Sequence, residues 1–317
     1  MIDLFPFAGF PVAVFGLGAE GLATARALRA SGAEVLAWDD DAERRAHAGA
    51  AGVPLRDLGA LDWREPVSLV IQHEIAHGKE KAHPFVAAAR AADCEVIADS
   101  ELLARAQRDA AYVAVVSREG AGAALDLFAH VLQISGRETE VGGDPGRALM
   151  DLHPLDLGGT YVLAMPPARA DITLSITFDA AVLLDLGHGP WPPCASRAET
   201  VAASRWVFHR QSGPKAAIVN VDDPAGRRIH GDLKAAGDQV VVPVSGRRRT
   251  PGGVYLAGGV LYDDLAGQAL ALTELALPAG RARTEAALHA AAVYAAAVAL
   301  GTPAHAALAS LRSFFID

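Results

Sequence analysis

The stretch PVAVFGLGAEGLATARAL, residues 11–28, decides how the first part of the chain folds. An apolar run of strand composition ends at a glycine, and an amphipathic helical pattern follows it. Gly16, Gly18 and Gly21 have the G-x-G-x-x-G spacing, and Asp39 closes the next apolar run about twenty residues later. This arrangement predicts a Rossmann-like fold with a pyrophosphate at the start of the helix, although the motif serves NAD, FAD and UDP-sugars alike. A tight turn between strand and helix that needs glycine for packing alone is the competing interpretation.

Apolar runs and helical patterns continue to alternate, which predicts parallel βαβ units and an α/β fold. A second α/β unit begins with the apolar run 110–117. Further strands are predicted at 160–165, 180–186, 215–221 and 238–244, a hairpin at 252–264, and helices at 284–301 and from Pro303 onward. We expect two domains, residues 1–108 and 109–317.

The bulk composition limits the classes of function. The 317 residues carry a formal net charge of −9, which argues against a general nucleic-acid or membrane-surface binder. Two cysteines, Cys94 and Cys194, form no disulfide framework and favour a reducing compartment. The N-terminal segment lacks a basic region followed by a long apolar core, so we expect no signal peptide, no membrane span and a cytoplasmic protein.

The stretch AVVSREGAGAALDL, residues 114–127, has the layout of a phosphate-binding loop between a strand and a helix. Its bend carries Glu119, and no lysine occurs anywhere in residues 110–135. The sequence therefore has the shape of a nucleotide site without the positive charge on which such a site depends.

Taken in order, these segments resemble the Mur ligase family, and most closely its D-glutamate-adding members. The resemblance rests on VAVFGLGAEGLATARAL, AEVLAWDD, VGGDPG (141–146), HRQSGPKAAIVNVDDP (209–224) and the hairpin at 252–264. It implies a Rossmann-like UDP-sugar-binding domain, then a central P-loop-NTPase-like domain for ATP and magnesium. We expect the family's third domain, which binds the incoming amino acid, to be absent, because the chain ends where its linker would begin.

The resemblance places the family's motifs on positions that carry other residues here. Ala121 stands in the slot of the loop lysine, and Gly122 stands in the slot of the metal-binding hydroxyl. The magnesium-binding glutamate falls on Ala164, and the carbamylated lysine falls on Ser204. The altered ATP and metal positions are Glu119, Gly120, Ala121, Gly122, Ala164 and Ser204, and further slots hold Pro190, Ala286 and His289.

These replacements predict a catalytically inactive paralogue with no cofactor, since phosphoryl transfer depends on lysine and Mg²⁺ to stabilise charge. Four acids lie near inferred anion sites and are expected to replace the charge of a missing ligand: Glu20, Glu74, Glu119 and Asp144. UDP-sugar binding at the vestigial site is expected to be weak or absent. That site comprises Gly16, Gly18, Gly21 and Asp39.

The string HEIAHGKEKAH, residues 73–83, matches the zinc motif H-E-x-x-H and adds a third histidine. Zinc proteases need both histidines on one helix face, whereas this string follows a strand and precedes Pro84, so a solvated loop is the expected structure. Zinc binding by His73, His77 and His83 remains an alternative.

Three functional hypotheses follow. The first is an inactive paralogue with a binding or scaffold role in peptidoglycan precursor synthesis. The second is a working ATP-dependent D-glutamate ligase completed by a partner domain, and the third is a metal-binding protein using the 73–83 loop. The apolar, proline-rich segment around Trp191 is expected either to fill the empty nucleotide cavity or to form a surface for a homodimer or a cell-wall synthesis partner.

Overall fold

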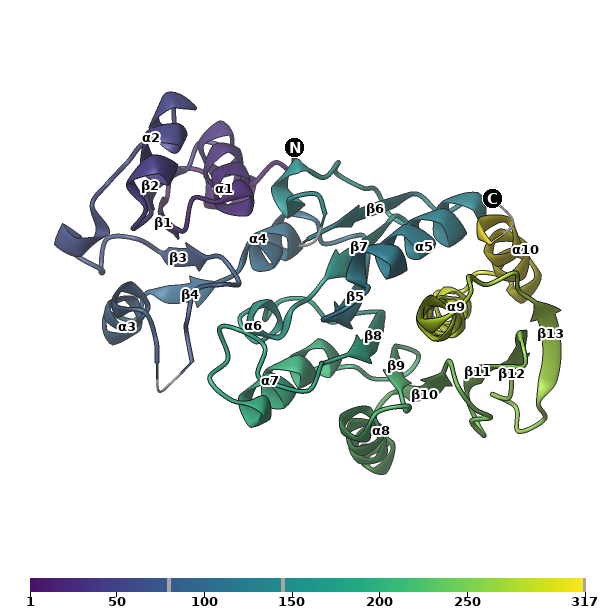
Figure 1. The fold of residues 1–317 in the computed structure, drawn as a ribbon. Coiled ribbons are helices and arrows are strands. Elements are labelled where there is room, and N and C mark those ends of the chain that lie inside the picture. Colours follow the sequence, from purple (N-terminus) through teal and green to yellow (C-terminus); the bar gives the residue numbers. More distant parts are fainter. Residues whose placement is uncertain (79–80, 144–145, 316–317) are drawn as a thin grey trace.

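The computed structural model describes residues 1–78, 81–143 and 146–315 and contains two β-sheets (Figure 1). The first sheet has the order β2-β1-β3-β4, with all neighbours parallel. Its strands are β1 (Pro11–Phe15), β2 (Glu34–Trp38), β3 (Ser68–Ile71) and β4 (Glu95–Ile97). Its helices are α1 (Ala19–Ala30), α2 (Ala42–Ala50), α3 (Pro84–Ala91) and α4 (Asp99–Ala106). These elements form what we call the first unit.

The second sheet has the order β13-β12-β11-β10-β9-β8-β5-β7-β6. Its neighbours are parallel from β6 to β11, and β12 and β13 add an antiparallel edge. The strands are β5 (Ala111–Ser117), β6 (Thr139–Gly142), β7 (Thr160–Ala164), β8 (Ala180–Asp185), β9 (Ala216–Asn220), β10 (Val240–Ser245), β11 (Val254–Ala257), β12 (Val260–Asp263) and β13 (Leu270–Glu274). With their helices they form the second unit.

The second sheet is covered on both faces. Side chains alternate along a strand, so Val113 and Val115 of β5 face one core while Ala114 and Val116 face another. The first of these cores contains α5 (Ala121–Ile134), α9 (Arg281–Ala299) and α10 (Ala304–Phe314). On the opposite side lie α6 (Pro167–Ala170), α7 (Arg197–Ser204) and α8 (Pro224–Ala236) (Figure 1).

The core on that opposite side is continuous with the first unit. It combines Ala114 and Val116 of β5 with Leu28 of α1 and Leu102 of α4, all of them fully buried. The first sheet ends at Ile97 and the second begins at Ala111, so the predicted boundary at residues 108 and 109 lies in the segment between them.

The α/β class and its parallel sheets are confirmed. The hairpin is present as β11 and β12, joined by Gly258 and Gly259 in the left-handed region. The predicted elements do not include β6, β13, α6, α7 and α8. The first three are short and have no clear periodicity, whereas α7 and α8 lie in segments for which no helix was predicted. Among the described helices, none has the length and apolar character needed to cross a bilayer.

Candidate functional site

The degenerate phosphate loop lies where β5 ends and α5 begins. β5 pairs with β7 on one side and β8 on the other, so the loop occupies the point where ligands bind in open parallel sheets. Gly120 precedes α5 with a φ of +69°, and no side chain caps the helix. The hydroxyl of Ser117 donates to the carbonyl oxygen of Glu119 at 2.5 Å, so this side chain stabilises the loop itself.

A carboxylate from α9 lies against this loop. A Cβ atom built on Gly120 would overlap Oε1 of Glu285 and would lie 3.1 Å from Cε1 of His289. Oε1 of Glu285 therefore rests on the loop at the start of α5, where a phosphate-binding loop would hold its phosphate. His289 lies one helical turn further and is only 4% exposed, and burial lowers its pKa to about 4. The imidazole is consequently neutral at physiological pH.

The crevice beyond the loop is a pocket of about 450 Å³ with an acidic lining. Among its described lining residues, five carry carboxylates and one is an arginine, Arg247. The carboxylates belong to Glu119, Asp185, Asp222, Asp223 and Glu285. Asp222 and Asp223 also bind backbone or hydroxyl groups nearby, which fixes the rim of the pocket.

A buried charge cluster joins the two units. Arg169 of α6 is fully buried, and its Nη2 donates to Oε1 of Glu20 on α1 at 2.5 Å. Its Nε lies 3.2 Å from Oδ1 of Asp99 on α4, and its Nη1 donates to the carbonyl oxygen of Ala164. Oε2 of Glu20 lies 3.2 Å from Nδ1 of His73. The cluster places Arg169 between the carboxylates of Glu20 and Asp99 at the interface, with the His73 ring against Glu20.

The cluster shifts the acid strength of both carboxyl groups. Burial alone would raise the pKa of Glu20, but Arg169 and His73 together lower it to about 2. Burial raises the pKa of Asp99 to about 6, against the opposing effect of Arg169. Glu20 is thus the carboxylate that stays charged beside the guanidinium, at the positive end of α1.

Side chains of the first unit itself pack against its glycine loop and bind its backbone. The carboxylate of Asp39 accepts from the backbone N–H of Leu17 at 2.6 Å and of Asp41 at 2.8 Å. The side chain of Gln72 packs against Gly16, where a Cβ would lie 3.1 Å from its Cγ. Gln72 is buried, and its amide atoms have no hydrogen-bond partner in the part of the chain that the structure describes.

No family model matches this chain. It is 36% identical over 324 aligned residues to the UDP-N-acetylmuramoylalanine–D-glutamate ligase of Caulobacter sp. (strain K31), covering 99% of this chain and 68% of that protein. The corresponding ligase of Rhizobium meliloti (strain 1021) is 34% identical with the same coverage. The chain belongs to the Mur ligase family.

Solved Mur ligase structures share the fold. The UDP-N-acetylmuramate:L-alanyl-gamma-D-glutamyl-meso-diaminopimelate ligase from Neisseria meningitides matches with a TM-score of 0.62 at 17% identity, covering 96% of this chain and 98% of that one. The murein peptide ligase from Psychrobacter arcticus 273-4 matches with a TM-score of 0.56 at 13% identity. These likenesses confirm the predicted fold class.

The positions to which the family resemblance maps the ATP and magnesium motifs carry no side chain suited to either group. Ala121 and Gly122 open α5 without a lysine or a hydroxyl group. Ala164 offers only its carbonyl oxygen, which accepts from Arg169, and the buried Ser204 hydroxyl donates to the carbonyl oxygen of Thr200. None of these four side chains supplies a carboxylate or carbamate for a divalent cation.

Trp191 does not line the crevice beyond the loop, so the expectation that it fills this cavity is wrong. Within the proline-rich segment around Trp191, the residues that line the pocket are Gly187 and His188. Trp191 is half-buried against the core shared by the two units, and its backbone N–H donates to the Thr200 hydroxyl.

The three histidines of the 73–83 string are not brought together. His73 faces Glu20, Nε2 of His77 lies 2.8 Å from Asp171, and Nε2 of His83 lies 3.2 Å from Asp40. Across the described ranges, no group of three or more His, Cys, Asp or Glu side chains is arranged to hold a metal ion. The geometry gives the metal-binding hypothesis no support.

Of the four acids predicted near anion sites, the structure places one in the buried charge cluster. Glu20 does lie at the start of α1 inside the charge cluster, whereas Glu74 and Glu119 are exposed and Asp144 lies outside the described residues. Glu285 was missed, although the helical spacing that buries His289 places it on the same face. Arg169 was also missed, and it is the only Lys or Arg between Arg147 and Arg197.

Proposed function

We propose that this chain is a catalytically inactive member of the Mur ligase family, related to its D-glutamate-adding enzymes. Its role would be binding or scaffolding in the synthesis of peptidoglycan precursors. The observation that carries the proposal is the carboxylate of Glu285 against Gly120 at the start of α5. A negatively charged side chain there would compete with a nucleotide phosphate for the same space.

The electrostatic penalty for ATP is large. Two unit charges about 4 Å apart repel by about 4 kcal/mol at an effective dielectric constant of about 20. That energy corresponds to about a thousandfold in affinity. Lysine and Mg²⁺ would normally offset such repulsion and stabilise the transferred phosphoryl group, and the residues at their positions supply neither charge.

We also propose weak or absent UDP-sugar binding. The carboxylate of Asp39 is already engaged with two backbone N–H groups, and Glu20 brings a negative charge to the start of α1. Both features oppose a diphosphate at this helix. We expect the partner to be a second copy of the chain or a cytoplasmic cell-wall synthesis protein, which sedimentation at several concentrations with and without that protein distinguishes.

Calorimetric titration with ATP in the presence of Mg²⁺ tests the proposal. We expect no saturable heat from the wild-type chain. A Glu285→Gln variant removes the charge at the loop, and Glu138→Gln removes an exposed charge elsewhere in the second unit as a matched control. A magnesium-dependent dissociation constant below about 100 µM for the wild type contradicts the proposal, since it corresponds to more than about 5 kcal/mol of binding free energy.

The competing hypothesis, a working ligase completed by a partner domain, requires this chain to bind ATP itself. The same titration therefore tests both hypotheses. Restoring the loop lysine with Ala121→Lys is not expected to restore binding, because Glu285, Ala164 and Ser204 are unchanged in that variant. Magnesium-dependent binding by Ala121→Lys alone would show that the loop was the single defect.

A further inference from the structure

We propose that the chain binds a small phosphate-bearing anion in a pocket at the amino-terminal edge of its second sheet, opposite the degenerate nucleotide loop. The pocket has a volume of about 380 Å³. Its lining includes Tyr112 near the start of β5, Asp179 just before β8 and Lys215 just before β9. Arg105 of α4 and Arg108 line it from the other side, so the pocket lies between the two units.

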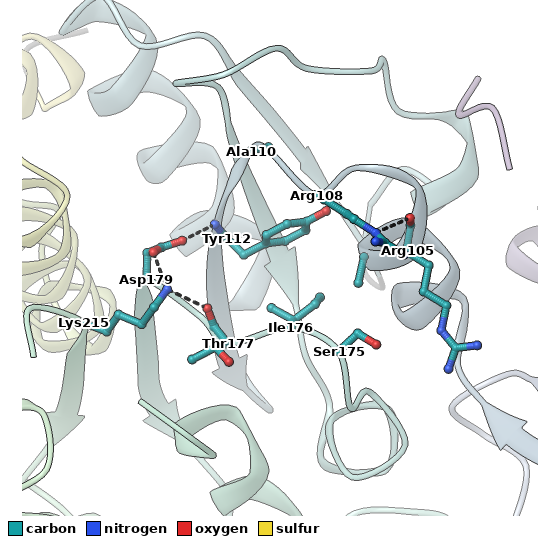
Figure 2. A pocket seen from close by; sticks show the side chains of 10 residues that line it. Arg105, Arg108, Ala110, Tyr112, Ser175, Ile176, Thr177, Asp179 and Lys215 are labelled. Atoms are coloured by element: carbon teal, nitrogen blue, oxygen red, sulfur yellow. Dashed lines mark hydrogen bonds and ion pairs between the residues drawn. The ribbon is translucent and has the colours of Figure 1, made fainter. Parts of the chain in front are cut away.

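Figure 2 shows the arrangement of these charges. Lys215 and Asp179 lie on one side of the Tyr112 ring, and Arg105 and Arg108 lie on the other. Nζ of Lys215 donates to Oδ1 of Asp179 at 2.5 Å and to the carbonyl oxygen of Thr177 at 2.9 Å. Oδ2 of Asp179 accepts from the backbone N–H of Tyr112. An ammonium group has three N–H donors, so this anchored lysine keeps one for a ligand.

The two arginines have different roles. Arg105 is held by two carboxylates, with Nη1 and Nη2 on Glu95 and Nε on Glu101. Among the described residues, Arg108 makes one hydrogen bond, in which its Nε donates to the carbonyl oxygen of Arg105 at 3.2 Å. Its Nη1 and Nη2 groups are therefore the donors at this pocket that no described carboxylate already occupies.

The polarity of this pocket is opposite to that of the nucleotide crevice. In the described lining, three cationic side chains accompany one carboxylate, in a chain whose net charge is −9. The crevice at the other edge of the same sheet has five carboxylates and one arginine. Carboxylates already pair with Arg105 and Lys215, so the attraction for an anion at the amino-terminal edge comes from Arg108, which pairs with no carboxylate among the described residues. The acidic crevice at the carboxyl-terminal edge repels an anion.

The free donors select the class of ligand. A guanidinium, an ammonium and the Thr177 hydroxyl, which has no hydrogen bond within the described ranges, match the several acceptor oxygens of a phosphate. Ala104, Ala110 and Ile176 supply an apolar wall suited to a compact organic part. The geometry therefore fits inorganic phosphate or a small phosphomonoester, held between residues of both units.

Calorimetric titration of the full chain with inorganic phosphate tests this inference. We expect saturable binding with a dissociation constant on the order of 1 mM, as for a small ligand held by few groups. Arg108→Gln should weaken it about tenfold by removing a charge-assisted interaction. Thr177→Val should weaken it about threefold, because the variant keeps the backbone carbonyl that anchors Lys215 while removing a neutral hydrogen bond.

Two matched controls locate the site. Arg228→Gln changes an exposed arginine of α8, and Arg247→Gln changes the arginine of the nucleotide crevice, so both should bind phosphate like the wild type. No saturable binding below about 20 mM would overturn the inference, because that affinity is under about 2.5 kcal/mol. Binding that Arg247→Gln abolishes and Arg108→Gln leaves unchanged would also overturn it and would contradict the proposed loss of the nucleotide site. Failure of phosphate binding alone leaves the ATP prediction untouched.

Discussion

Glu20 holds its charge between Arg169 and His73, and that environment makes folding stability depend on pH. Its pKa of about 2 in the folded chain lies below the ordinary value of 4.5. A depressed pKa contributes stability that is present above about pH 4.5 and is lost as the pH falls toward 2. Asp99 acts in the opposite direction, because burial raises its pKa from 3.8 to about 6, and its contribution to stability is lost as the pH rises between those two values.

We expect Glu20→Gln to lower the free energy of unfolding by about 3 kcal/mol at pH 7, because it removes one partner of a buried ion pair. Between about pH 4.5 and 2, the free energy of unfolding of the variant should fall less steeply than that of the wild type. Urea unfolding across pH 2–7 measures both effects. Glu34→Gln changes an exposed glutamate of β2 and is the control. If the free energy of unfolding falls equally steeply below about pH 4.5 in the wild type and in Glu20→Gln, the lowered pKa of Glu20 is contradicted.

Helix starts show why glycine motifs are weak evidence for a ligand. A Cβ on Gly21 of α1 would overlap the carbonyl oxygen of Gly16, and a Cβ on Gly226 of α8 would overlap that of Asn220. Both glycines let a helix pack directly on the strand before it. The third glycine of the G-x-G-x-x-G motif therefore has a structural role here that is independent of any pyrophosphate.

Helix α8 offers a comparison of two glycines within one element. Gly231 is exposed with nothing within 4 Å of a built Cβ, so Gly231→Ala should raise the free energy of unfolding by about 0.5–1 kcal/mol through helix propensity. Gly226→Ala should lower it by about 1–3 kcal/mol, because backbone or helix must shift. Thermal unfolding of both variants provides the measurement. Equal effects of the two substitutions would show that α8 does not pack on β9 as described.

The whole molecule is joined by a shared apolar core and by one buried arginine. Residues of α1, α4 and β5 belong to the same core, so the two units should unfold together. Trp38 and Trp63 report on the first unit, and Trp191 and Trp206 report on the second. Variants that keep one pair of tryptophans at a time should give coincident urea transitions.

Replacing the buried cation should uncouple the units. We expect Arg169→Met to separate the two fluorescence transitions and to destabilise the first unit by about 3–5 kcal/mol, because Glu20 and Asp99 lose their shared partner. The exposed Arg210→Gln, which loses only a bond to the Leu174 carbonyl oxygen, is the control. Coincident transitions in Arg169→Met would show that the apolar core alone couples the units.

The amino-acid sequence by itself determined the α/β class and the two glycine loops. It also shows which residues, Ala121, Gly122, Ala164 and Ser204, stand where the family resemblance maps the ATP and magnesium motifs. These features are readable because periodicity and motif spacing are local properties of the chain. Only the tertiary structure decided that Glu285 lies on Gly120, that Arg169 reaches Glu20, and that Arg108 and Lys215 share a pocket. Each of these pairs joins distant segments whose proximity depends on strand order and helix packing, and no local pattern encodes either.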